Sequence, residues 1–316
     1  MQTDFHPMPS SERIPMKRII ASILLLSLLL CCGCAAQAED TKIVASFYPV
    51  YILAQNVLRD VDGVTLSCMT APSTGCLHDY QLLTSDMRTL SGAKALLING
   101  AGMESFLPGL QEQLPALEIV DCSQGVALLE EDCAEAGHDH DHGHDHGEYN
   151  AHIWLAPRNA MEMVGNMEEA LSALLPESAE KIHANAAAYR AELDALDQEL
   201  SAAIAALPHK KIVTFHEAFP YFAQAYGLEV AAVVALEPDE PLSPRMLAEV
   251  VDAVKAAGCP PLFTEPQYES AAVQAVSQET GAPVYALDPL VTGDGAMTAY
   301  QDVMRANLAV LQEALK

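Results

Sequence analysis

A long amphipathic segment between two sets of short β-branched stretches constrains the fold of this chain more than any other feature. From Pro176 to Leu207, apolar residues recur at a three/four spacing over about eight turns, which predicts one long helix. On each side of it, short strand-like stretches alternate with helical patterns such as 51–58 and 86–90, which is typical of α/β folds with parallel sheets. The stretches are 43–47, 64–68, 95–98 and 118–121, and then 212–215, 230–234, 262–264 and 284–287. We predict two similar α/β lobes, 35–175 and 209–316, joined by a rigid spine helix at 176–208.

The first 34 residues have the pattern of a leader that directs export. A basic start, Met16-Lys17-Arg18, precedes an apolar stretch at 19–30 of signal-peptide length, too short to span a membrane comfortably. Cys34 follows Gly33 at its end, which resembles the lipobox of bacterial lipoproteins. We expect an exported protein, translated from Met1 or Met16, that is periplasmic or anchored by lipid at Cys34 on the outer face of the cell membrane.

The charge balance excludes one class of partner. The chain carries 16 basic against 43 acidic side chains, a net charge of −27. Nucleic-acid binding needs clustered lysine and arginine to contact phosphates, and the sequence has no such cluster. We therefore expect no nucleic-acid partner, while an acidic surface is compatible with a cationic ligand.

Five cysteines follow the leader, and export permits disulfides between them. Four of them, Cys68, Cys76, Cys122 and Cys133, could pair in three ways, whereas Cys259 has no obvious partner. Because Cys76 stands two residues before a histidine, a thiolate metal ligand is an alternative there to a disulfide or to plain packing.

A histidine-rich tract at 137–147 indicates that the protein binds a transition metal, since imidazole is the commonest metal ligand near neutral pH. Its five histidines are His138, His140, His142, His144 and His146. The tract has no apolar periodicity, so we expect a solvated loop that fixes ligand geometry poorly. We predict an auxiliary, low-affinity metal site there and a tight site elsewhere.

Four separated residues are candidates for that tight site. Each lies just beyond a predicted strand or at a loop–helix junction: His78, His152, His216 and Asp288. Ligands of doubly wound sheets bind outside the carboxyl ends of the strands, so two residues from each lobe can converge on an interlobe cleft. Glu217 and Glu265 are alternatives for the acidic role, and Asp79 could orient a neighbouring imidazole.

The candidates belong to a series of short motifs that follow one another along residues 41–316. These are Ser46-Phe47-Tyr48-Pro49, His78-Asp79-Tyr80, Ser85-Asp86, Asn99-Gly100, His152-Ile153-Trp154-Leu155, His216-Glu217-Ala218-Phe219, Glu265-Pro266-Gln267 and Leu287-Asp288-Pro289-Leu290. Together they resemble the metal-binding extracytoplasmic solute-binding lipoproteins of bacterial zinc and manganese ABC transporters. The resemblance implies two (β/α)4 lobes joined by a long helix, with metal held in the cleft by His78, His152, His216 and Asp288. It also implies delivery to a membrane permease that works with a cytoplasmic ATPase.

The proposed ligand set favours zinc as the cargo. Three imidazoles and a carboxylate suit the four-coordinate sites of Zn²⁺, whereas manganese favours more oxygen, and the histidine-rich loop before His152 resembles the zinc branch. We predict zinc capture for an ABC permease and no enzyme, because a site closed by four protein ligands leaves no position for a reactive water.

Several alternatives stay open at this point. The fourth ligand is Asp288, Glu265 or water. The cargo could be manganese or iron, carried by a protein of the same type. A metal-dependent hydrolase would use Glu217 or Glu265 as general base. A surface adhesin is a further interpretation of the sequence.

Overall fold

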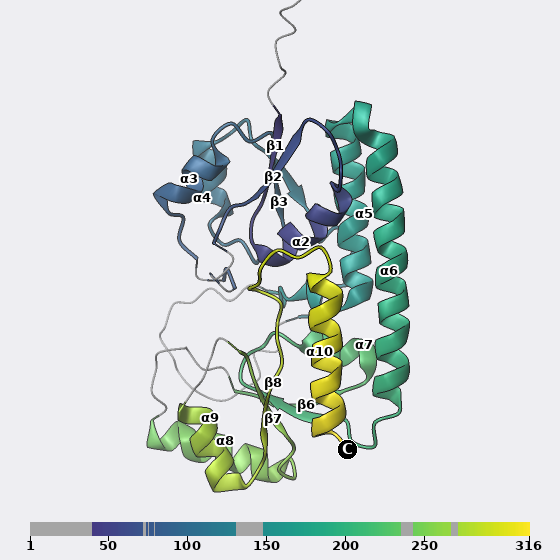
Figure 1. The fold of residues 1–316 in the computed structure, drawn as a ribbon. Helices are drawn as coiled ribbons and strands as arrows, with labels where there is room; N and C mark the ends of the chain where they lie inside the picture. The colour runs from purple at the N-terminus through teal and green to yellow at the C-terminus, as the bar shows by residue number, and fades with distance from the viewer. Residues whose placement is uncertain are drawn as a thin grey trace, which may run out of the picture. The chain divides into compact units, whose positions relative to one another are not determined.

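Two parallel sheets form the framework of the described part of the chain (Figure 1). The first has the order β2-β1-β3-β4, with β1 (Thr41–Ala45), β2 (Val64–Cys68), β3 (Ala95–Ile98) and β4 (Glu118–Asp121). The second has the order β6-β5-β7-β8, with β5 (Lys211–Thr214), β6 (Glu229–Val233), β7 (Leu262–Thr264) and β8 (Val284–Ala286). Every pairing between these strands is parallel. The predicted α/β class and the similarity of the two halves are confirmed.

The structure is a computed structural model, and it describes residues 40–71, 74, 76–78, 80–130, 148–234, 243–266 and 271–316. Residues 40–316 form one compact unit. The leader with Cys34, the five histidines of the 137–147 tract, Asp79 and Cys133 lie outside the described residues, so what we expect of them stays a prediction.

The helices alternate with the strands, as the sequence predicts. They are α2 (Tyr48–Val57), α3 (Thr84–Leu90), α4 (Leu107–Gln113), α5 (Pro157–Leu174), α6 (Ala179–Ala205), α7 (Pro220–Tyr226), α8 (Pro244–Ala256), α9 (Ala271–Thr280) and α10 (Ala299–Ala314). The first strand ends earlier than predicted, at Ala45, because α2 begins at Tyr48 with Pro49 in its first turn. A proline at that place has no N–H to lose and is preset for a helix.

The long helix α6 runs past elements of both halves, as Figure 1 shows. It packs against α2 and α5 from the first half and against α7 and α10 from the second. Its buried face carries the predicted apolar stripe, with Ile182, Leu193 and Leu200 fully buried. It is shorter than the predicted segment, because Pro176–Ser178 forms a separate 3₁₀ turn before it.

A buried carboxylate, Glu104, ties together the carboxyl ends of β1 and β3. Its Oε1 accepts hydrogen bonds from the Ser46 hydroxyl at 2.7 Å and the Asn99 backbone N–H at 2.8 Å, and its Oε2 accepts from the Gly100 N–H at 3.1 Å. Burial raises the pKa of Glu104 to about 7, while these three donors act in the opposite direction. The Asn99 side chain also donates to the Ala151 carbonyl at 2.9 Å, one residue before a predicted metal ligand.

Glu104→Gln should lower the free energy of unfolding by about 1–3 kcal/mol, because an amide group brings a donor to a place where three donors converge. Urea denaturation followed by far-UV circular dichroism measures the loss. The matched control is Glu112→Gln on the exposed face of α4, which should change the value by less than about 0.5 kcal/mol. Equal losses in both variants would contradict a structural role for the Glu104 network.

Candidate metal centre

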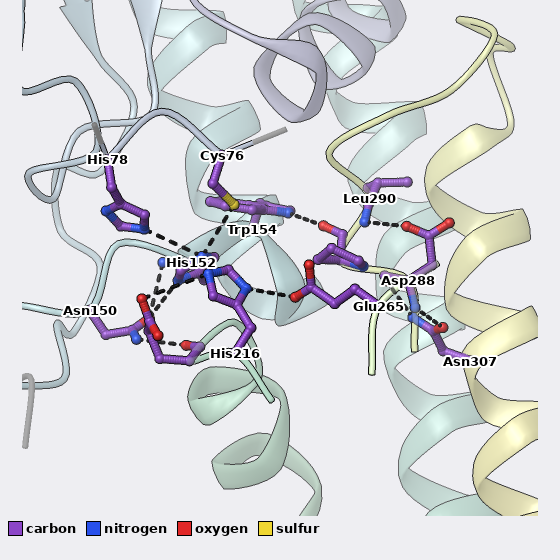
Figure 2. Close-up of polar contacts among 12 residues, drawn as sticks. Cys76, His78, Asn150, His152, Trp154, His216, Glu265, Asp288, Leu290 and Asn307 are labelled. Carbon is purple, nitrogen blue, oxygen red and sulfur yellow. Dashed lines mark hydrogen bonds and ion pairs between the residues drawn. The ribbon is translucent and has the colours of Figure 1, made fainter. Parts of the chain in front are cut away.

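Three of the predicted ligands come together from separate segments of the chain. His78 lies in the loop after β2, His152 directly precedes the 3₁₀ turn Ile153–Leu155, and His216 follows the end of β5. The ring centroid of His152 lies 5.0 Å from that of His78 and 4.9 Å from that of His216. Figure 2 shows the three rings gathered at one point, with Cys76 beside them.

His152 is the centre of this arrangement. Its side chain is fully buried. Its Nε2 lies 3.5 Å from Nε2 of His78 and 3.5 Å from Sγ of Cys76. On its other side, its ring packs against Trp154 with the centroids 5.1 Å apart. One nitrogen of a buried imidazole therefore faces two further groups that can bind metal.

Asn150 determines which nitrogen of His152 carries the proton. Its Oδ1 accepts the backbone N–H of His152 at 3.0 Å and lies 3.3 Å from the ring Nδ1. Its Nδ2 donates to the carbonyl of Glu217 at 2.8 Å, which fixes the orientation of the amide. Because an amide oxygen only accepts, we assign the proton to Nδ1, and Nε2 keeps its lone pair toward Cys76 and His78.

Two glutamates flank His216. Its Nδ1 lies 2.6 Å from Oε1 of Glu265, a side chain that is only 4% exposed. A carboxylate at Nδ1 orients the ring and makes the other nitrogen a better ligand. That nitrogen, Nε2, lies 3.7 Å from Oε1 of Glu217. Glu265 is thus placed to position His216, and Glu217 lies on the side from which an ion can be bound.

The potential ligand atoms form two overlapping groups, in each of which all atoms lie within 4.8 Å of one another. One group is Cys76, His152 and His216, and the other is His78, His216 and Glu217. They share His216, and the 3.5 Å contact between His78 and His152 links them further. Each group by itself has donors close enough together to bind one small cation, and Cys76 and His78 belong to different groups.

Asp288, the fourth residue predicted from the sequence, follows β8 as expected but is held elsewhere. Its Oδ1 accepts the N–H of Leu290 at 2.7 Å, and its own N–H donates to Oδ1 of Asn307 at 2.8 Å. Figure 2 shows its carboxylate directed to Leu290 and away from the histidine rings. The structure does not bring Asp288 into either group of ligand atoms, and its role as a ligand stays a prediction.

The surroundings change the protonation of two of these groups. Burial lowers the pKa of His152 well below its usual value, and the neighbouring His216 and His78 lower it further. The imidazole is therefore neutral at neutral pH and able to bind metal. Burial also raises the pKa of the Cys76 thiol, and Glu265 and Glu217 add to the effect.

The disulfides considered for Cys68, Cys76 and Cys122 are not formed in the structure, where all three are free thiols. The three sulfurs have separate surroundings. Cys76 faces His152, while the buried thiol of Cys122 donates to the Val120 carbonyl at 3.8 Å. Burial raises the pKa of Cys68 to about 11. None of the pairings that the sequence allows among Cys68, Cys76 and Cys122 is formed in the structure, and Cys133 lies outside the described residues.

Asn150 contacts a predicted ligand and was not itself predicted from the sequence. Besides its contacts to His152, its backbone carbonyl accepts the hydroxyl of Tyr221 at 2.7 Å, and this hydroxyl accepts the N–H of Leu129 at 3.0 Å. The only signal in the sequence is an asparagine two residues before a histidine, which is too common to identify such a contact.

Comparison with known proteins identifies the family. The sequence model of the family described as zinc-uptake complex component A, periplasmic, matches residues 43–314. The chain belongs to this family. The zinc-binding lipoprotein AdcA of Streptococcus pneumoniae is 32% identical over 312 residues, which cover 94% of this chain and 61% of AdcA. The high-affinity zinc uptake system protein ZnuA of Brucella abortus is 29% identical, over 82% of this chain and 86% of that protein.

The solved structures agree with this membership. The crystal structure of Zn(II)-bound AdcA from Streptococcus pneumoniae, 27% identical, has a TM-score of 0.73 and covers 87% of this chain and 58% of that one. The chain thus spans about three-fifths of the length of this streptococcal relative. The resemblance inferred from the ordered motifs is confirmed. Within the described residues, no helix has the length and apolar character needed to cross a membrane.

Proposed function

We propose that this chain captures Zn²⁺ outside the cell membrane and delivers it to the permease of an ABC transporter. In this proposal His78, His152 and His216 bind the ion. The observation that carries it is the position of His152, which is buried, with Oδ1 of Asn150 beside its Nδ1 and its Nε2 facing Cys76 and His78. A lone pair held in this way is available to a cation without loss of a proton.

The donor set supports zinc as the cargo. Imidazole nitrogen suits Zn²⁺ better than it suits manganese, which favours oxygen ligands. Glu217 and Glu265 add negative charge beside His216, and this charge offsets that of a divalent cation bound by neutral rings. The names of the relatives, zinc-binding lipoprotein and zinc uptake protein, support the same cargo.

The membrane side of the proposal rests on the leader and on the family. Membership in a family described as a component of a zinc-uptake complex supports delivery to a permease driven by a cytoplasmic ATPase. A lipid on Cys34 would hold the exported chain on the outer face of the membrane, and the lipoprotein among its relatives supports this placement.

Deleting residues 138–146 should remove weakly bound metal and leave the tight site intact, because none of the three proposed ligands lies in the tract. Calorimetric zinc titration of the mature chain, residues 35–316, measures both classes of site. The double variant His78→Ala with His216→Ala should show the reverse, losing tight binding and keeping the weak binding. If the tract deletion alone removed the tight site, the assignment of the three histidines would be wrong.

The same titration separates the remaining rivals. Tighter binding of Mn²⁺ than of Zn²⁺ would favour a manganese carrier of the same fold. Nothing in the comparisons supports the hydrolase alternative, since the family is described as a transport component. Only hydrolysis of an ester or peptide that is lost in a Glu217 variant would support that alternative.

A further inference from the structure

Cys76 stands beside the three histidines, although the zinc site proposed above does not use it. Its Sγ lies 3.5 Å from Nε2 of His152, and it shares a group of ligand atoms with His152 and His216. Leu77, which follows it, is fully buried and anchors the segment in the core. His78 comes next, and its backbone carbonyl accepts a hydrogen bond from the hydroxyl of Ser105 at 2.9 Å. The segment thus presents a thiol and an imidazole, two residues apart, to the same ring.

The two 3.5 Å separations match the edges of a tetrahedral zinc site. With Zn–N bonds of about 2.0–2.1 Å and a Zn–S bond of about 2.3 Å, tetrahedral angles put two nitrogens about 3.3–3.4 Å apart and nitrogen and sulfur about 3.5–3.6 Å apart. Nε2 of His152 lies 3.5 Å from both Sγ of Cys76 and Nε2 of His78. With the proton assigned to Nδ1, Nε2 is the nitrogen of His152 that is available to bind the ion beside these two groups.

Of the neighbouring carboxylates, Asp288 and Glu265 are less well placed to complete the site, whereas Glu217 shares a group of ligand atoms with His78 and His216 and is the carboxylate that competes with Cys76. Oδ1 of Asp288 accepts the N–H of Leu290, and Asp288 is outside both groups of ligand atoms. Oε1 of Glu265 lies 2.6 Å from Nδ1 of His216, so it contacts the ring nitrogen other than Nε2. A simple S–H···N hydrogen bond from Cys76 to His152 is the competing explanation of the sulfur contact, and an experiment can distinguish the two.

We propose that the thiolate of Cys76 is the fourth ligand of the zinc site, together with the three histidines. This inference rests on the proposed function. When the Zn–S bond forms, the thiol proton passes to solvent and the metal keeps its oxidation state. A thiolate is a soft donor that suits Zn²⁺ and discriminates against Mn²⁺, Mg²⁺ and Ca²⁺. Cys76 therefore determines specificity as well as completing the coordination.

Cobalt(II) substitution tests the proposal, because a cobalt–thiolate bond gives a near-ultraviolet charge-transfer band that nitrogen and oxygen ligands do not give. The titration uses the mature chain without residues 138–146, which removes the five histidines of the tract that could also bind cobalt. We expect this band together with the intense visible bands of a tetrahedral ion. Cys76→Ser should lose the charge-transfer band, while Cys68→Ser, a matched thiol at the end of β2, should keep it.

Zinc X-ray absorption provides a second measurement that needs no substitution at Cys76. The zinc-loaded chain should show one sulfur neighbour at about 2.3 Å among nitrogen neighbours at about 2.0–2.1 Å. Tight tetrahedral binding without a sulfur signal in either measurement overturns the role of Cys76 and leaves the proposed function standing. A cobalt spectrum that changes in Glu217→Gln or in Asp288→Asn, and not in Cys76→Ser, assigns the fourth position to that carboxylate instead. Absence of tight binding in the parent chain overturns the proposed function, and this inference with it.

Discussion

His152→Ala should abolish tight zinc binding. The Nε2 of His152 lies 3.5 Å from both Sγ of Cys76 and Nε2 of His78, and burial keeps this imidazole neutral. Loss of an outer-shell partner already costs about 10–100-fold in metal affinity, so loss of this ligand should cost more than about 100-fold. Competition with a chelator of known zinc affinity measures the change. The zinc-dependent increase in melting temperature should disappear in parallel, because it reports binding to the folded state.

His209→Ala is the matched control for this experiment. His209 is exposed and follows α6, away from the ligand groups, so its removal should leave zinc affinity unchanged. Far-UV circular dichroism of the metal-free His152→Ala chain checks that it folds. Retention of tight binding in a folded His152→Ala chain would contradict the proposed site and would point to a centre built without this ring.

The fold could be predicted largely from the sequence, because periodicity reports which face of an element is buried. The strand stretches 64–68, 95–98 and 118–121 match β2, β3 and β4 at both ends. The long helix was predicted from its apolar stripe, and its true start at Ala179 was not, because a proline favours both a helix start and a 3₁₀ turn. The shared strand order of the two sheets depends on crossover connections, which periodicity does not encode.

The candidate site could be predicted only in part. The rule that ligands bind beyond the carboxyl ends of parallel strands brought His78, His152 and His216 together, and the structure places them side by side. The same rule applies equally to Asp288, whose side chain turns to a local backbone N–H instead. Side-chain direction within a loop depends on neighbours far away in sequence. For the same reason the contact of Cys76 with His152, 76 residues along the chain, has no signal in its spacing.

Trp154→Ala should lower the free energy of unfolding by about 3–5 kcal/mol, the range found when a large buried aromatic side chain is removed. Trp154 is fully buried and makes an edge-to-face contact with Phe47, with the ring centroids 5.3 Å apart. Its Nε1 donates to the Pro289 carbonyl at 2.8 Å, and its own carbonyl accepts the hydroxyl of Tyr300 at 2.6 Å. These contacts join residues from both halves of the chain. The cavity that Trp154→Ala leaves would therefore weaken the packing of both halves.

Trp154→Phe separates the contribution of ring packing from that of the Nε1 hydrogen bond. It keeps most of the ring volume but leaves the buried Pro289 carbonyl without its donor, which should cost about 1–3 kcal/mol. Urea denaturation followed by far-UV circular dichroism measures both variants, since Trp154 is the only tryptophan of the chain and fluorescence is lost with it. A loss in Trp154→Ala no larger than that in Trp154→Phe would show that the hydrogen bond, and not the packing of the ring, stabilises this contact. The packing account requires the alanine variant to be the less stable by about 1 kcal/mol or more.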